Sequence, residues 1–372
     1  MILSWGVFPS TGGSTIIVNS ISEAFSPEQL VLAGQQPEKI PDKKWQDFSD
    51  IKLYYLNPFI FGISRKPKMI RWLKLFSIMK EVENIVKREK ITRIIAIFPD
   101  EFYTYVAYRV SKKLSIPYDI WFHNSYLDNT SGLQYKIAKR LQPVFFDTAN
   151  RLFVMSDGLN QEMKKNYPKI NFQTLVHGFK IGSNVDVNVA IKSEKVKFLY
   201  SGSLNHSCLD ASIRMMKIIK DNPNWELHVF AGNPEFFHTQ GITGDNVVFH
   251  NFLPIVEFVQ RLKEFDIMLL PHGIDGLRSE FEYRTIFPTR TIPLLFSGKP
   301  ILAHSPKDSF LTDFLIDNKC AYLVTEKDDQ KLKMAIDELI ANTDLRELLV
   351  TNSIIAANQF KVENVAKKIR EF

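Results

Sequence analysis

A glycine-bearing turn near the start of the chain has residue types that suit anion binding. It reads Pro9-Ser10-Thr11-Gly12-Gly13-Ser14-Thr15 and follows a short apolar run. Gly12 and Gly13 let the backbone approach a ligand closely, and Ser14 can cap a helix whose free N–H groups favour an anion. The spacing is not the GxGxxG of dinucleotide-binding turns, so these residues predict either an anion site or a plain tight turn.

Three side chains that follow apolar runs suit proton transfer or hydroxyl binding. His123 comes directly after the run Asp119–Phe122, where a His can donate a proton or bind a sugar hydroxyl, although a lone His there is more often structural. Asp100 and Glu101 follow the run Ile94–Phe98 and would orient an acceptor hydroxyl, but Asp100 could equally cap the next helix.

The second half of the chain carries candidates for binding a diphosphate. Gly202 and Ser203 end an apolar run, where backbone N–H groups could meet a phosphate or simply turn the chain. A helix N-terminus combined with arginine suits a diphosphate, whereas surface arginines in a loop are the alternative. Three arginines and two threonines lie around one predicted helix start: Arg278, Arg284 and Arg290, with Thr289 and Thr291.

The sequence gives no support to metal or nucleic-acid chemistry. It has no HExxH, GxxxxGK[ST] or GxSxG pattern, and its two cysteines, Cys208 and Cys320, cannot form a disulfide framework or a four-cysteine zinc site. The 47 basic and 41 acidic residues give a net charge of +6, but no recognised nucleic-acid module accompanies it. We therefore expect no metal, no cofactor and no nucleic-acid partner.

The elements that must position these residues alternate between short apolar runs and helical periods, which predicts parallel sheets covered by helices. The expected strands are Ile2–Phe8, Leu30–Ala33, Ile51–Tyr55, Ile94–Phe98, Asp119–Phe122 and Leu152–Met155, then Val196–Ser201, Trp225–Ala231, Val247–His250, Ile267–Leu270, Pro300–Ala303 and Ala321–Val324. The expected helices are Thr15–Phe25, Met69–Arg88, Glu101–Lys113 and Leu133–Phe146, then Asp210–Asp221, Ile255–Glu264, Thr289–Phe296, Phe310–Ile316, Gln330–Ala341 and Arg346–Gln359. Phe179–Glu194 is polar and is the expected linker.

Basic charge is concentrated in the first half of the chain. Residues 1–180 carry 25 Lys and Arg against 16 Asp and Glu. The segment Arg65–Phe76 mixes Lys and Arg with large apolar residues, as does a helix that rests on an anionic membrane, although an ordinary helix with a solvated basic face fits equally well. No apolar run approaches the ~20 residues that span a bilayer. We expect a cytoplasmic protein that has peripheral contact with the inner face of the membrane.

Several stretches resemble the GT-B glycosyltransferases, and more narrowly the retaining, nucleotide-sugar-dependent enzymes of family 4. They are Ala149–Gly158, Val176–Phe179, Phe198–Leu204, Phe287–Arg290 and Leu295–Ala303. The resemblance implies two Rossmann-like α/β domains that face each other across a cleft, with a C-terminal helix that crosses back. The implied divisions are an acceptor-binding domain over 1–180, a nucleotide-sugar-binding domain over 181–358 and the returning helix over 359–372.

The resemblance also implies roles for individual residues. His123 and Arg290 match the catalytic positions, and Asp100 and Glu101 lie on the acceptor side. The donor site is expected to include Gly12, Gly13, Ser14, Gly202, Ser203, Arg284, Thr289 and Thr291. The family's usual pair of glutamates is missing, because Thr285 and Pro293 stand at those places. Glu280 and Glu282 are close enough in sequence to replace the first of them.

The implied activity is transfer of a sugar from a nucleotide sugar to a saccharide or lipid-linked saccharide in glycan biosynthesis, with a retaining route that needs no metal. Two alternatives remain open at this point. One is a nucleotide-sugar epimerase of the same architecture, which needs acid and base groups in the cleft. The other is a catalytically weak partner subunit, which the missing glutamates would suit.

Overall fold

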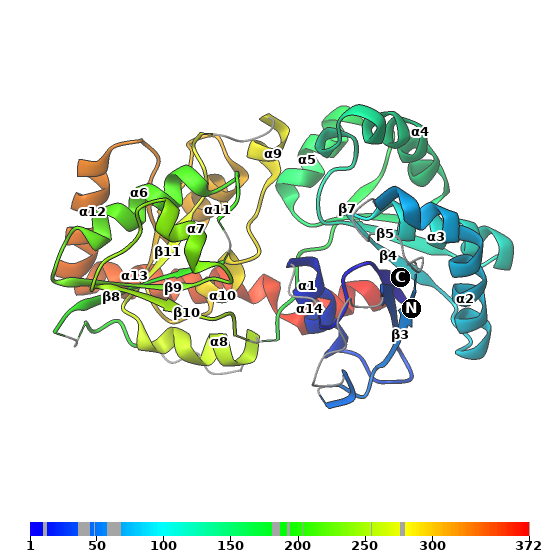
Figure 1. The fold of residues 1–372 in the computed structure, drawn as a ribbon, viewed down its shortest axis with the longest axis horizontal. Helices are drawn as coiled ribbons and strands as arrows, with labels where there is room; N and C mark the ends of the chain where they lie inside the picture. Colours follow the sequence, from blue (N-terminus) through cyan, green and yellow to red (C-terminus); the bar gives the residue numbers. More distant parts are fainter. Residues whose placement is uncertain are drawn as a thin grey trace. The chain divides into compact units, whose positions relative to one another are not determined.

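The computed structural model describes residues 1–9, 13–35, 45–47, 49–57, 68–180, 187–191, 194–202, 204–253, 255–275 and 280–371, drawn as a ribbon in Figure 1. The chain divides into two compact units. Unit 1 comprises Met1–Lys180 and Lys361–Phe372, and unit 2 comprises Ile181–Phe360. Within the described residues no helix is both long and apolar enough to cross a membrane.

Unit 1 is built on a parallel sheet with strand order β3-β2-β1-β4-β5-β6-β7 in the described residues. The strands are β1 Ile2–Ser4, β2 Val31–Gln35, β3 Lys52–Leu56, β4 Ile94–Phe98, β5 Tyr118–Phe122, β6 Arg151–Val154 and β7 Phe172–Thr174. Every residue of β4 and β5 is buried, as expected for strands covered on both faces. The expected parallel arrangement is confirmed. The strand β1 ends at Ser4 rather than Phe8, and β7 was not foreseen.

Two of the helices of unit 1 begin at side-chain caps. The helices are α1 Gly13–Ser22, α2 Leu75–Arg88, α3 Glu101–Leu114, α4 Gly132–Thr148 and α5 Asp157–Asn166, with 3₁₀ turns η1 Trp45–Asp47, η2 Lys68–Lys74 and η3 Leu127–Asn129. Asp100 caps α3 by accepting from the Tyr103 N–H at 3.1 Å, and Ser156 caps α5, a helix the sequence did not predict. The expected helix Met69–Arg88 is a 3₁₀ turn followed by α2.

The last helix, α14 Val362–Arg370, belongs to unit 1, and the expected return of the C-terminal helix is confirmed. It lies beside α1, as Figure 1 shows. The Val362 N–H donates to the Phe179 carbonyl at 3.0 Å. Gly178 makes this close approach possible, because a Cβ there would lie 3.0 Å from Ile21 and 3.2 Å from Val362 and Val365.

Unit 2 is built on a second parallel sheet, with strand order β10-β9-β8-β11-β12-β13 among the residues described. Its strands are β8 Val196–Ser201, β9 Trp225–Phe230, β10 Val247–His250, β11 Ile267–Pro271, β12 Ile301–His304 and β13 Tyr322–Val324. All six match expected strands to within a residue or so. One apolar core, which includes Phe198, Tyr200 and Leu227, joins the sheet to the helices beside it.

The helices of unit 2 include several that the sequence did not predict. They are α6 Leu209–Lys220, α7 Pro234–Thr239, α8 Ile255–Arg261, α9 Glu280–Thr285, α10 Thr291–Leu295, α11 Phe310–Asn318, α12 Asp329–Ala341 and α13 Thr343–Ala357, with 3₁₀ turns η4 Leu262–Glu264 and η5 Asn358–Phe360. The short helices α7 and α9 have only six residues each, too few to show a period in the sequence. The helix α10 is shorter than the expected Thr289–Phe296, and Arg290 precedes its first residue.

Candidate functional site

His123 lies at the carboxyl end of β5 in unit 1, beside the first turn of α1. Its backbone N–H donates to the Phe98 carbonyl at 3.1 Å, which fixes the residue against β4. Its Nδ1 lies 2.9 Å from the Ser14 hydroxyl in the first turn of α1. The edge of Trp121 contacts the ring, with centroids 4.8 Å apart. The structure thus brings together two candidates that are 109 residues apart in sequence.

His177 is the nearest titratable neighbour of His123, with ring centroids 4.6 Å apart. Both rings are buried, and neither Nε2 has a hydrogen-bond partner in the described part of the chain. Burial holds the pKa of His123 well below its usual range, and His177 lowers it further. Burial alone lowers the pKa of His177 to about 3. Both imidazoles are therefore neutral at physiological pH. Sequence reasoning did not single out His177, because the strand β7 that leads to it was missed.

The two acceptor-side candidates have different surroundings. Asp100 is buried, caps α3 and forms an ion pair with Arg71 in which Nη1 lies 2.7 Å from Oδ2. The capping alternative for Asp100 is therefore what the structure shows. Glu101 instead lines a pocket of about 190 Å³ together with Phe98, Tyr126 and Gln134. This pocket lies beside the carboxyl ends of β4 and β5, the edge at which ligands of parallel sheets bind.

Arg290 and Gly202 form the best-defined contact among the donor candidates in unit 2. Gly202 follows β8 with φ +107°, a conformation that side chains rarely adopt. A Cβ at this position would lie 3.1 Å from Cζ and 3.2 Å from Nη2 of Arg290. The guanidinium therefore lies directly against the turn at the carboxyl end of β8. A glycine is needed here for two reasons, the backbone angle and the space.

The guanidinium of Arg290 is held by residues on two elements. Its Cζ lies 5.3 Å from the centre of the Tyr200 ring, and Nη2 lies 3.7 Å from the Cys208 thiol. Burial acts to lower the pKa of Arg290, but the Tyr200 and Cys208 groups raise it above its usual value. The cation is thus fixed in place and stays charged. Cys208 was not predicted as a site residue, because contact with Arg290 spans 82 positions.

The loop after β8 also holds a His–carboxylate pair. His206 Nε2 lies 3.1 Å from Oε1 of Glu282 in α9. The Asn205 side chain accepts from the Ser207 N–H and hydroxyl, which tightens this turn. Thr285, at the first missing glutamate position, donates its hydroxyl to the Phe281 carbonyl. Glu282 lies three residues before Thr285 on the same helix, α9.

The remaining candidates are less closely engaged. Gly13 is the exposed first residue of α1, Arg284 is exposed at the end of α9, and Thr289 is half-buried. Thr291 is buried, and its N–H already donates to the Pro288 carbonyl. Gly12, Ser203 and Arg278 lie outside the described residues, as does the side chain of Glu280. Over the ranges that the structure describes, no group of three metal-binding side chains is close enough to hold an ion.

Comparisons with known proteins agree with this architecture. No family model matches the chain, and no curated protein matches it by sequence. Among solved structures, the chain is similar to a sucrose-phosphate synthase from Thermosynechococcus elongatus, with a TM-score of 0.73 and 14% identity over 100% of this chain and 97% of that one.

Two further solved structures cover the whole chain. Anabaena HepE, solved in complex with UDP, has a TM-score of 0.69 and 12% identity over 100% of this chain and 98% of its own. The lipopolysaccharide outer core galactosyltransferase WaaB in its apo form has a TM-score of 0.62 and 16% identity over 100% and 97%. With its two parallel sheets of seven and six described strands, the chain has the GT-B fold.

Proposed function

We propose that the chain is a glycosyltransferase that moves a sugar from a nucleotide sugar to a saccharide or lipid-linked saccharide acceptor. The observation that carries the proposal is the Arg290 guanidinium, held against Gly202 at the carboxyl end of β8. A fixed cation beside a glycine turn suits a diphosphate, because charge-assisted bonds to phosphate are strong and the glycine lets the phosphate come close. HepE, whose fold the chain shares, binds UDP.

In the proposed reaction, unit 2 binds the donor and Arg290 stabilises the negative charge that grows on the leaving diphosphate. The bond between the anomeric carbon and the diphosphate oxygen breaks, and the acceptor hydroxyl oxygen forms the new bond to that carbon. The acceptor hydroxyl attacks from the same face that the diphosphate leaves, which retains the anomeric configuration as in family 4, and its proton passes to the departing phosphate. The short helix α10 gives little help, since the Thr291 N–H is already engaged. Arg290 therefore supplies most of the positive charge, without a metal.

His123 is the proposed partner for the transferred sugar in unit 1. Its neutral ring accepts or donates one hydrogen bond through Nε2 while Nδ1 is held by Ser14. A neutral imidazole suits a sugar hydroxyl, because each can act as hydrogen-bond donor or acceptor toward the other. Glu101 and the pocket it lines are the proposed acceptor side.

The epimerase alternative requires carboxylates that exchange protons with the sugar. Of the three groups that could exchange protons, His123, Asp100 and Glu101, Asp100 is occupied by Arg71 and the α3 cap, which weakens that alternative. A catalytically weak partner subunit remains the second candidate, because neither Thr285 nor Pro293 supplies a carboxylate. The two candidates differ in nucleotide turnover: a transferase slowly hydrolyses its donor without acceptor, and a partner subunit does not.

A thermal-shift panel with UDP, GDP, ADP and CMP and their common sugar conjugates tests the donor site. A nucleotide at ~100 times its dissociation constant stabilises the fold by about 2.7 kcal/mol. Arg290→Ala should weaken the binding of whichever nucleotide gives a shift by roughly 10- to 150-fold, since a hydrogen bond to a charged group contributes about 1.5–3 kcal/mol. The matched control is Arg261→Ala, which removes an exposed guanidinium that pairs with Glu264 in unit 2. Equal nucleotide affinity in both variants would remove the donor-site assignment.

A further inference from the structure

We propose that unit 1 docks on an anionic bilayer through a surface built from η2, the start of α2 and the first half of α4, and that the pocket beside this surface receives the head of a lipid-linked acceptor. The docking surface consists of Leu73, Lys74, Phe76, Leu133, Tyr135, Lys136, Lys139 and Arg140. The acceptor part of this inference rests on the proposed transferase function, whereas the membrane part does not.

The docking surface exposes unusually large apolar side chains. Phe76 and Leu73 are 77% and 73% exposed, the highest values for large apolar side chains among the described residues. On α4, Leu133 is 57% exposed and Tyr135 is 41% exposed. Exposed Leu and Phe side chains on a helix are the groups that enter the boundary between lipid headgroups and acyl chains.

The two parts of the docking surface flank the same end of α3. Trp72 of η2 packs on Phe102 and on Tyr105, with ring centroids 5.4 Å apart in both cases. On the other side, Gln134 and Ile137 of α4 line the pocket that also touches Glu101 at the start of α3. Because α3 begins between them, η2 and α4 meet the carboxyl edge of the sheet together.

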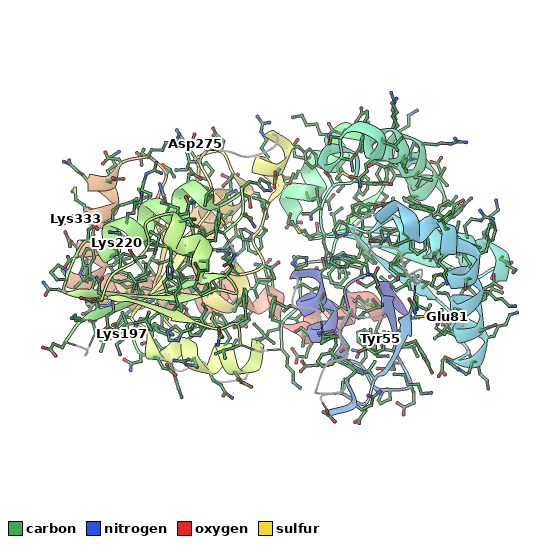
Figure 2. The ribbon with its side chains drawn as sticks, in the orientation of Figure 1. Tyr55, Glu81, Lys197, Lys220, Asp275 and Lys333 are labelled. Carbon is green, nitrogen blue, oxygen red and sulfur yellow. The ribbon has the colours of Figure 1, made fainter. Side chains whose placement is uncertain are left out.

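The charge of these segments is complementary to an anionic lipid surface. Residues 68–80 and 129–146 contain no acidic residue. Lys136, Lys139 and Arg140 are exposed on α4 beside Leu133 and Tyr135. The first acidic residue after η2 is Glu81, which Figure 2 labels on α2. Basic side chains that alternate with exposed apolar ones bind anionic headgroups while the apolar groups insert.

The pocket next to the docking surface suits the sugar head of a lipid-linked acceptor. Its lining includes the rings of Phe98 and Tyr126, 4.8 Å apart, together with the polar side chains of Glu101, Thr130 and Gln134. Aromatic faces with a few placed polar groups are typical of small-molecule sites. The volume of about 190 Å³ fits one sugar ring rather than a long glycan. A sugar carried on a lipid would arrive at this pocket from the surface on which unit 1 rests.

Vesicle co-sedimentation of the full chain tests the docking surface. The vesicles contain phosphatidylcholine with or without about 30% phosphatidylglycerol, so that only one set presents an anionic surface. The wild type should bind the anionic vesicles at least ~10-fold more tightly than the neutral ones, and less tightly as salt rises, because salt screens the attraction. Leu73→Ser/Phe76→Ser, Leu133→Ser/Tyr135→Ser and Lys136→Gln/Lys139→Gln/Arg140→Gln should each lower that binding roughly tenfold or more.

The matched control removes two exposed apolar groups in unit 2. Leu348→Ser/Ile355→Ser changes side chains on α13 that are 56% and 63% exposed, and it should leave vesicle binding unchanged. The inference is overturned if the wild type fails to sediment with anionic vesicles, or if the control loses as much binding as the docking variants. Circular dichroism melts exclude variants that fail to fold.

The nucleotide thermal shift separates this inference from the proposed function. All docking variants should keep the wild-type response to nucleotide, because Arg290 and Gly202 belong to unit 2. Loss of vesicle binding with retained nucleotide response supports the docking surface. A wild type that responds to nucleotide but ignores anionic vesicles defeats the docking surface and leaves the donor site intact. A wild type that binds vesicles but no nucleotide defeats the proposed transferase function and, with it, the acceptor part of the inference.

Discussion

Replacing Gly202 with alanine should weaken nucleotide binding in addition to lowering the stability of the fold. The backbone there has φ +107°, which costs of order 1–3 kcal/mol for a residue with a side chain. The new Cβ would lie 3.1 Å from Cζ of Arg290 and 3.4 Å from Nη1, so the guanidinium must move by a few tenths of an ångström. A flexible side chain moves at little cost in stability, but this one is the proposed diphosphate ligand. We expect a nucleotide affinity at least ~10-fold weaker, equivalent to about 1.4 kcal/mol.

Gly241→Ala is the control that separates the two effects. Gly241 also lies in unit 2 with a positive φ of +78°, but nothing lies within 4 Å of a Cβ built there. Both variants should therefore lose similar stability in urea unfolding, whereas only Gly202→Ala should lose nucleotide affinity in isothermal titration calorimetry. If Gly202→Ala binds the nucleotide as tightly as Gly241→Ala does, Arg290 does not contact the diphosphate and the donor-site argument fails.

Three further predictions follow from unit 1. The pKa of His177 is about 3 in the folded state and near 6.5 in the unfolded state, so the unfolded state binds more protons between these values. The stability that is present above pH 6.5 should therefore fall by about 2 kcal/mol at pH 5. Urea unfolding of His177→Gln should show a correspondingly smaller pH dependence. Arg71→Met should lower the free energy of unfolding by about 3–5 kcal/mol, because it leaves the buried Asp100 carboxylate unpaired. Adding Asp100→Asn, which keeps the α3 cap, should restore part of that loss. A loss of less than ~1 kcal/mol for Arg71→Met would contradict the buried ion pair. Gly178→Ala should cost about 1–3 kcal/mol and raise hydrogen exchange in α14, because its Cβ would meet Ile21 and Val365; unchanged exchange would argue against the close packing.

The central strands β4, β5 and β11 could be predicted from the sequence because they are buried on both faces. Runs such as Ile94–Phe98 and Val196–Ser201 have apolar residues at most positions, and the observed strand bounds equal the expected ones. The strand β7 has only three residues, with two of them half-buried, and it carries no such signal. The 3₁₀ turn η2 shares the apolar and basic composition of α2, so composition alone could not separate the two.

Individual site residues were predictable where the local backbone determines their role. Gly202 was found because glycine after a buried strand predicts a sharp turn, and Asp100 because an acidic residue before a helix predicts a cap. The contacts of His123 with His177 and of Arg290 with Cys208 join distant parts of the chain. They depend on strand order and helix packing, which a single sequence does not specify.

The same distinction bears on whether the proposed donor site needs the usual glutamates. A family motif fixes residues by their spacing, but the chemistry needs only charges at the right place. Thr285 bonds its own helix and Pro293 is buried, so neither can bind a sugar hydroxyl. Arg290, by contrast, is held by Tyr200 and Cys208 from the β8 side of the unit, so its position does not depend on the missing carboxylates. If the diphosphate supplies most of the binding energy, the nucleotide is retained through Arg290, and the His206–Glu282 pair is left to decide which sugar or ribose hydroxyls fit beside it.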